Sequence, residues 1–494
     1  MASQKQPSLV DALIPVAALV TMLAAAVYLF SSDSSSGANQ IALILAACIG
    51  MVVGIKNGHC WKDIEEGMVR SIGVATPALL ILFSVGSLIG AWILSGTVPA
   101  MIYYGMQVLS PDYFYAASCL LCALVALSIG SSWTVAGTLG IALIGIAQAV
   151  GLSVEITAGA IISGAYFGDK MSPMSDTTNL APAVAGTDIF SHIRHMTWTT
   201  VPSILIALLI FLFIGLSADS SGIDTNLDAT LTLLSDEFHV GPHLLLPLVV
   251  VIYLAYRKMP AFPTVILGTL AGVLSAALFQ FDGVVKLADD PNLGAAMALV
   301  KGLWIAMFNG YSASTGNEML DGLLSRGGMS GMVNTVWLIL SAMAFGGVME
   351  ATGLLNRLLQ SMLSMVKTSS SLVITTLGCA IGANVITADQ FIAIILPGRM
   401  LKLEYTRHKL APVNLSRALE DSATVTSPLV PWNTCGAFMA STLGVATIAY
   451  LPFAFFNLIC PVVSAGYAYF QIKLLPLEES DLLDSADEPR SAEA

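Results

Sequence analysis

Long apolar runs separated by short polar segments make up most of this chain. A helix needs about 20 apolar residues to cross the hydrocarbon core of a bilayer. The pattern predicts ten full crossings, and the first is too long for a signal-peptide core, so we expect it to be retained. The predicted crossings are 10–30, 41–55, 74–95, 157–182, 197–217, 243–257, 262–281, 330–351, 411–441 and 448–472.

Two further apolar runs are interrupted by glycine and polar residues. Residues 113–150 form two short arms around Gly130–Thr134, and residues 371–401 form two arms around Gly382–Asp389. Irregular backbone at membrane depth is tolerated only where it is buried in protein or lines a cavity. Because each arm is barely long enough to cross, we predict that both runs are re-entrant hairpins.

Two of the predicted crossings are also broken near the middle. The first, 157–182, contains the polar stretch Gly168–Asn179, and the second, 411–441, contains Glu420–Thr434. A charged residue at a helix centre costs roughly 2.5–3.5 kcal/mol on insertion scales. Such residues indicate an ion or substrate site, although Gly168–Asn179 could also be a cytoplasmic loop between two spans.

The composition supports a polytopic membrane protein. Of 494 residues, 56% are hydrophobic and only 11% are charged, and the mean hydropathy is +0.81. Much of the net charge of −12 falls in the 219–237 loop and the tail after 478. No basic stretch suggests nucleic acid, and no phosphate loop, dinucleotide fingerprint or catalytic triad suggests an enzyme.

Basic residues in the connectors predict the orientation, because cytoplasmic loops carry an excess of lysine and arginine. Connectors with basic residues alternate with connectors without them. This alternation places both termini in the cytoplasm if the hairpins do not cross the membrane. His192 and His195, beside Arg194, are expected on a cytoplasmic loop, either solvated or sensing pH. The basic residues taken as cytoplasmic are Lys56, Lys62, Arg70, Arg194, Arg257, Lys258, Arg357, Lys367 and the 399–409 cluster.

The landmarks recur in the two halves of the chain. Gly90 and Gly96 match Gly347 and Gly353 at an offset of 257, and the hairpin tips match at 252 from Gly130 to Gly382. Asp169 matches Asp421 at 252, and Asn179 matches Asn433 at 254.

Each half then holds five crossings and one hairpin, so the halves are inverted, as in secondary transporters with broken helices. The fold class is therefore an all-α polytopic membrane protein. Its predicted parts are the N-terminal spans and connector 1–73, a first repeat core 74–217, a linker 218–329, a second repeat core 330–472 and an acidic tail 473–494.

The breaks supply oxygen atoms that suit a small hard cation. Asp169 and Asp421 are the leading candidates, since a buried carboxylate can hold either a proton or a sodium ion. Lys170 is expected as a counter-ion for Asp169 or Asp176, or to reach an interface, and Asp389 as a support near the site. The candidate ion- or substrate-binding residues are Asp169, Asp421, Ser131, Ser132, Thr134, Ser172, Asp176, Thr177, Thr178, Asn179, Asn384, Thr387, Glu420, Thr426, Asn433 and Thr434.

Residues 164–182 closely resemble the signature of the NhaC-type sodium/proton antiporters. Residues 325–329 and 335–340 resemble a segment of the same family's second half, and the resemblance extends roughly from 40 to 472. The resemblance implies the ion-transporter superfamily fold, elevator-type movement, a homodimer and a prokaryotic inner membrane. It also implies Na⁺ and H⁺ as the transported ions, with Na⁺ near Asp169 and Asp421, and no cofactor.

Two functions fit these residues. The first is Na⁺/H⁺ antiport that exports sodium, and the second is Na⁺-coupled transport of an organic acid, such as malate or lactate, or of an amino acid. A cavity with room for a four-carbon acid favours the second, and an oxygen-lined site with room only for an ion favours the first. A channel is less consistent with discontinuous helices, which suit alternating access.

Overall fold

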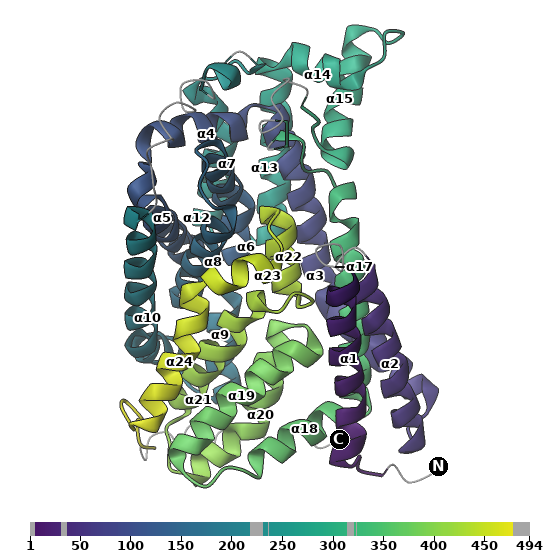
Figure 1. Ribbon diagram of the computed structural model, residues 1–494, viewed down its shortest axis with the longest axis vertical. Coiled ribbons are helices and arrows are strands. Elements are labelled where there is room, and N and C mark those ends of the chain that lie inside the picture. Colours follow the sequence, from purple (N-terminus) through teal and green to yellow (C-terminus); the bar gives the residue numbers. More distant parts are fainter. Residues whose placement is uncertain are drawn as a thin grey trace.

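A computed structural model describes residues 5–30, 37–217, 231–235, 237–313, 321–322 and 324–477. These residues fold into an elongated bundle of helices, with no strand beyond one isolated bridge between Leu410 and Pro476 (Figure 1). Nine of the described helices are long and apolar enough to cross a membrane, or ten if one bent pair is counted as a span. Most of the predicted acidic loop 219–237 and the tail from 478 lie outside the described residues.

The first half of the chain contains three long helices, an interrupted hairpin, a broken helix and a further long helix. Its elements are α1 (Leu9–Phe30), α2 (Ala38–Lys56), α3 (Trp61–Leu94), α4 (Thr97–Val108), η2 (Pro111–Tyr113), α5 (Phe114–Ile129), α6 (Ser132–Val135), η3 (Ala136–Gly140), α7 (Ile141–Ala149), α8 (Val154–Met171), α9 (Asp176–Ala185) and α10 (Ile189–Ser217).

The second half follows a similar order after a linker that contains one long helix, α13, and several shorter ones. Its elements are η4 (Pro242–Leu245), α12 (Leu246–Tyr256), α13 (Ala261–Phe279), α14 (Phe281–Ala288), α15 (Ala295–Asn309), η5 (Ser330–Met332), α17 (Val333–Ala351), α18 (Leu354–Leu363), α19 (Ser369–Thr387), α20 (Gln390–Arg407), α21 (Pro412–Leu419), η6 (Glu420–Thr424), η7 (Ser427–Leu429), α22 (Thr434–Leu443), α23 (Thr447–Tyr450), η8 (Leu451–Phe453) and α24 (Phe455–Tyr469).

Several predicted boundaries need correction. Most of the charged connector before the third crossing is helical, because α3 already begins at Trp61. The second hairpin is interrupted at Ala388, not at Gly382, which lies inside α19. Ala388 has a left-handed backbone with φ 58, and the Asp389 side chain then accepts hydrogen bonds from the first amides of α20. The cap formed by the Asp389 carboxylate, and not Gly382, therefore determines where the second hairpin is interrupted.

The lengths of the hairpin arms do not by themselves make them re-entrant. Residues 111–129, 132–149 and 369–387 are each long and apolar enough to cross. Conversely, the predicted crossings 243–257 and 448–472 contain the shorter apolar helices Pro242–Tyr256 and Phe455–Tyr469.

Backbone landmarks recur along the chain at one nearly constant offset. Left-handed residues before α4 and α18 are 257 positions apart, at Gly96 and Gly353. The left-handed residues at the hairpin tips, Gly130 and Ala388, are 258 apart, and so are Gly186 and Gly444 after α9 and α22.

This spacing differs from the offset of 252 that matches Asp169 with Asp421. At an offset of 258, the position equivalent to Asp169 is Ser427, and Asp421 is equivalent to Ser163. Figure 1 places α4 and α18 near opposite ends of the molecule.

Close packing against α5 holds α8 in place. A Cβ atom added at Gly164 would lie 2.0 Å from the Cys119 carbonyl oxygen, and one at Gly168 would lie 2.3 Å from that of Ala123. Only glycine allows two helix backbones to approach so closely. The helix that carries the central polar motif is therefore positioned by direct backbone contact with the first hairpin.

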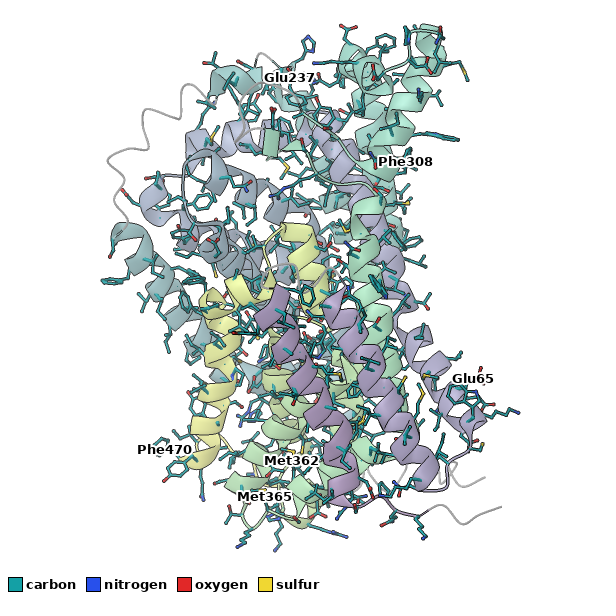
Figure 2. The ribbon with its side chains drawn as sticks, turned by 45° about the vertical axis from the view of Figure 1, so that its right-hand side comes forward. Glu65, Glu237, Phe308, Met362, Met365 and Phe470 are labelled. Carbon is teal, nitrogen blue, oxygen red and sulfur yellow. The ribbon has the colours of Figure 1, made fainter. Side chains whose placement is uncertain are left out.

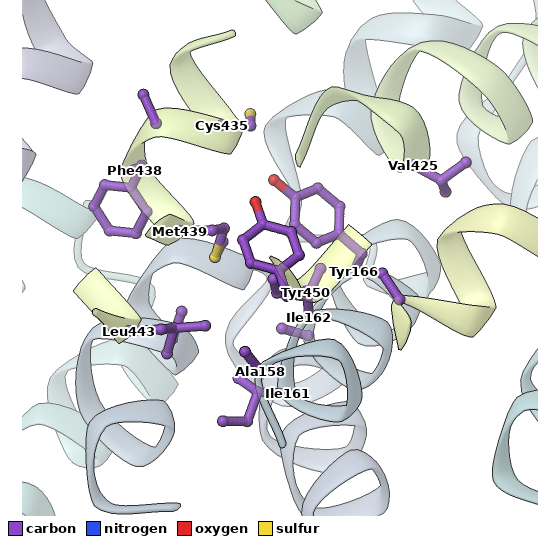
Figure 3. Packing of buried hydrophobic residues seen from close by; sticks show 14 of the residues in the cluster. Ala158, Ile161, Ile162, Tyr166, Val425, Cys435, Phe438, Met439, Leu443 and Tyr450 are labelled. Atoms are coloured by element: carbon purple, nitrogen blue, oxygen red, sulfur yellow. The ribbon is translucent and has the colours of Figure 1, made fainter. Parts of the chain in front are cut away.

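The opposite side of α8 packs in an apolar cluster against the second half of the chain. Figure 3 shows Tyr166 beside Tyr450, with Met439 and Leu443 of α22 approaching the isoleucines of α8. The indole of Trp133, at the first hairpin tip, stacks on Phe438 with ring centroids 4.0 Å apart. These contacts join the first hairpin, α8 and α22 into one packed unit.

Many large apolar side chains are exposed on the outside of the bundle, as expected where helices face lipid. Figure 2 shows Phe308 and Phe470 projecting away from the helices, and both are more than half exposed. Glu237 and Met365 lie near opposite ends of the same view.

Candidate functional site

The break between α8 and α9 is the sequence motif predicted as half of the site. Pro173 has no amide hydrogen, so it cannot continue the ladder of α8. The Asn179 side chain donates hydrogen bonds to the carbonyls of Pro173, at 3.0 Å, and Ser175, at 2.7 Å. The loop Ser172–Ser175 is thus stabilised by the first turn of the following helix.

Asp169 joins this broken helix to the tip of the first hairpin. Its Oδ2 accepts hydrogen bonds from the Ser132 amide, at 3.0 Å, and the Ser132 hydroxyl, at 2.6 Å. Ser131 caps the same tip, because its Oγ accepts the Thr134 amide at 3.2 Å. The carboxylate therefore lies at the start of a helix, where the backbone dipole favours negative charge.

A cavity of about 670 Å³ opens beside Asp169. Three other helices, α9, α20 and α22, begin at its wall, where Asp176, Gln390 and Thr434 line it. This volume lies within the range of small-molecule sites and exceeds the needs of a single ion. The predicted site residues that line the cavity are Ser131, Ser132, Thr134, Asp169, Asp176, Thr177, Asn179, Asp389 and Thr434.

Other predicted residues of the second half do not line the cavity but connect the break segments. The Asn384 side chain donates to the Ala423 carbonyl at 2.6 Å and to the Thr426 hydroxyl at 3.0 Å. Asn433 donates to Asn384 at 3.2 Å and accepts from the Cys435 amide at 3.0 Å. Thr387 donates to the Ala383 carbonyl at 2.9 Å.

Ser172 and Thr178 are buried within the first break and also lie outside the cavity lining. Ser172 Oγ accepts the Met174 amide at 3.3 Å, and Thr178 donates to the Lys170 carbonyl at 2.9 Å. Both hydroxyls therefore stabilise the loop of the break.

Lys170 and Asp421 form an ion pair that is completely buried. The partner of Lys170 is thus Asp421, not Asp169 or Asp176, and Lys170 does not reach an interface. Thr199 also donates to Asp421 Oδ1, at 3.1 Å. Neither Asp421 nor its neighbour Glu420 lines the cavity. In this structure Asp421 therefore pairs with Lys170 and, unlike Asp169, does not line the cavity.

The structure reveals three residues whose position was not expected. Lys258, taken only as an orientation signal, lines the cavity from the turn between α12 and α13. Gln390 accepts a hydrogen bond from Ser427 at 3.3 Å. With the 258-residue register, this contact is equivalent to the one between Ser132 and Asp169. His192, expected on a loop, is instead buried in α10 and 2.8 Å from Ser416 Oγ.

Comparison with known proteins gives a consistent result over most of the chain. A family model described as the Na⁺/H⁺ antiporter family matches residues 164–472. The Na⁺/H⁺ antiporter NhaC of Alkalihalophilus pseudofirmus is 39% identical over 433 residues, which cover 87% of this chain and 89% of that protein.

Two relatives of similar extent carry other names. The arginine/ornithine antiporter ArcD of Halobacterium salinarum is 35% identical over 97% of this chain and 95% of that protein. The malate-2H⁺/Na⁺-lactate antiporter of Bacillus subtilis is 34% identical over 87% of this chain and 89% of that protein.

Proposed function

Because this chain belongs to the Na⁺/H⁺ antiporter family, we propose that it exports sodium in exchange for protons, with Asp169 as the cation-binding carboxylate. The observation that carries this proposal is the position of Asp169. It lies on the broken helix, contacts the hairpin tip and lines the cavity. A cation that enters the cavity therefore meets a carboxylate supported by hydroxyl groups, which are ligands that a hard cation prefers.

Exchange requires that the cation and the proton compete, and no covalent step is needed. A sodium ion bound at Asp169 stabilises the ionised carboxylate. When no sodium ion is bound, a proton at the acidic site neutralises the charge of the empty carrier. Alternating exposure of the loaded forms to the two sides of the membrane then couples the two gradients.

The proposed movement is an inverted-repeat, elevator-type one. The recurrence of backbone landmarks at 257 or 258 positions supports two related halves. The position of α4 and α18 near opposite ends supports their inversion (Figure 1). A prokaryotic inner membrane, cytoplasmic termini and a homodimer complete the proposal.

The test is transport by the purified protein in proteoliposomes. A sodium gradient is imposed, and the lumenal pH is followed with a fluorescent dye. We expect Asp169→Asn to lower sodium-driven proton movement at least tenfold, because an amide cannot neutralise the cation. Asp282→Asn is the matched control, since Asp282 is exposed on α14. Full exchange by Asp169→Asn would remove that residue from the mechanism.

A second candidate function is exchange of a small organic solute together with sodium. It is favoured by the cavity of about 670 Å³, which has Lys258 and the start of α9 on its wall. Lys258 and the α9 amides could hold a carboxylate, while Asp169 and Asp176 could hold an ammonium group or Na⁺. The relatives named for malate and lactate and for arginine and ornithine are consistent with it.

The same vesicles separate the two candidates. Sodium-driven proton movement without added solute supports the first, and a strict requirement for malate, lactate, arginine or ornithine supports the second. Lys258→Ala should weaken uptake of a carboxylate solute severalfold but leave solute-free Na⁺/H⁺ exchange unchanged.

A further inference from the structure

A second group of charged side chains is enclosed in the protein but does not line the cavity. Lys170, Arg417, Glu420 and Asp421 are all completely buried. Charged residues at membrane depth are costly and mark ion or proton pathways. The pair between Lys170 and Asp421 satisfies two of these charges, and the other two remain to be explained.

Many polar atoms around this group have no hydrogen-bond partner among the described residues. Both carboxylate oxygens of Glu420, Oδ2 of Asp421, and Nε and Nη2 of Arg417 are buried and unpaired. So are Nε2 of His192 and of His195 on α10, and Oγ of Ser464 on α24. Buried polar groups are nearly always paired with protein or with ordered water. Ordered water between these groups would satisfy them.

We name this group the polar seam: Lys170, His192, His195, Thr199, Arg417, Glu420, Asp421 and Ser464. At its inner end, Glu420 lies within electrostatic range of Asp169 and Lys170. Further along, Thr199 donates to Asp421, and His195 interacts with Arg417. At its outer end, Arg417 donates to the carbonyl of Lys473 at 3.1 Å, and Lys473 is exposed. The seam therefore extends from the neighbourhood of the cation site to the protein surface.

The chemistry of the seam suits a proton better than a metal cation. A sodium ion needs several free oxygen ligands, whereas Asp421 is already paired with Lys170, and Arg417 occupies the Lys473 carbonyl. A proton instead moves along water and titratable side chains without a vacant coordination site. Glu420 is suited to carry it, because its buried carboxyl group lies within electrostatic range of both Asp169 and Lys170.

We propose that Glu420 is the proton-carrying residue and exchanges its proton with solvent through the polar seam, while the cation reaches Asp169 through the cavity. This inference rests on the proposed Na⁺/H⁺ exchange. When sodium leaves Asp169, the uncompensated carboxylate favours a proton on nearby Glu420. When sodium binds, Glu420 releases the proton to a water of the seam. The two carboxyl groups thus act as a coupled pair.

The experiment compares two kinds of exchange in the same proteoliposomes. One is sodium-driven proton movement, and the other is exchange of radioactive sodium for unlabelled sodium at equal pH, which needs no proton. We expect Glu420→Gln to lower the first at least tenfold and to leave the second within twofold of the unmodified protein. Asp169→Asn should abolish both, and Glu65→Gln, at an exposed position (Figure 2), should change neither.

The outcomes distinguish the seam from the underlying function. Undiminished sodium-driven proton movement by Glu420→Gln would overturn the seam, and so would equal loss of both exchanges by this variant. If the unmodified protein exchanges no sodium in either assay, the proposed function fails, and this inference fails with it. Thr199→Val, which removes one hydroxyl of the seam at nearly constant volume, should slow only the proton-dependent exchange.

Discussion

At the scale of single residues, the clearest constraint is the buried pair of Lys170 and Asp421. Removing one partner of a buried ion pair leaves an uncompensated charge and typically costs about 3–5 kcal/mol. We therefore expect Lys170→Met and Asp421→Leu each to lower the thermal unfolding temperature in detergent strongly. The double variant should recover most of the loss, because neither charge of this pair is then left without its partner. A double variant as unstable as either single one would show that the two side chains do not act as a pair.

Residue types located the polar break around Asp169, but they did not predict how Asp421 and Lys170 are placed. The carboxylate, hydroxyl and proline cluster around Asp169 indicated a break that lines the cavity. Asp421 was matched to Asp169 because both are acids, although the backbone register pairs Asp169 with Ser427. Spacing along the chain cannot reveal that Lys170, adjacent to Asp169, turns to a different partner. That choice depends on which helix packs against each face of α8.

At the scale of the element, α8 depends on glycine where it meets α5. Gly168→Ala would place a Cβ atom 2.3 Å from a backbone oxygen of α5, so the helices must separate. Overpacking of this kind costs typically 1–3 kcal/mol, and it would also displace the adjacent Asp169 from Ser132. We expect a lower unfolding temperature and at least a tenfold loss of exchange. Gly382→Ala is the control, since nothing lies within 4 Å of its Cβ position. Equal behaviour of the two variants would contradict the role of the close approach.

The apolar pattern predicted where the helices lie, but it did not predict the residues at which they end. Runs such as 10–30 and 330–351 match α1 and α17 closely, because length and hydropathy alone define them. The second hairpin tip was placed six residues early, at Gly382 and not Ala388, because glycine is the usual left-handed residue. Ala388 adopts that conformation because the carboxylate cap of Asp389 and the packing around it stabilise the turn.

At the scale of the whole molecule, the packing separates two groups of helices. Helices α1, α2, α3, α13, α14, α15 and α17 pack mainly with one another, and α5, α6, η3, α8, α9, α10, α19, α20, α21 and α24 form the second group. The second group carries Asp169 and the polar seam. An elevator-type movement would therefore slide the second group along the first, and contacts between the groups must break during transport.

A disulfide across this boundary tests the movement. A Cβ atom at Gly137, in the first hairpin, would lie 3.4 Å from the Val85 side chain on α3, so Val85→Cys with Gly137→Cys places two thiols within bonding range. Oxidation should lower the rate of sodium exchange at least tenfold, and reduction should restore it. Gly50→Cys with Val348→Cys is the matched pair within the first group, where the added Cβ lies 3.0 Å from Val348, and its oxidation should leave exchange unchanged. A disulfide between α3 and the first hairpin prevents the two helix groups from sliding past each other, whatever the lipid or the driving gradient. Full exchange by the oxidised Val85–Gly137 pair would therefore mean that α3 and the first hairpin move as one body. The cation would then have to be released by local opening of the hairpin tips.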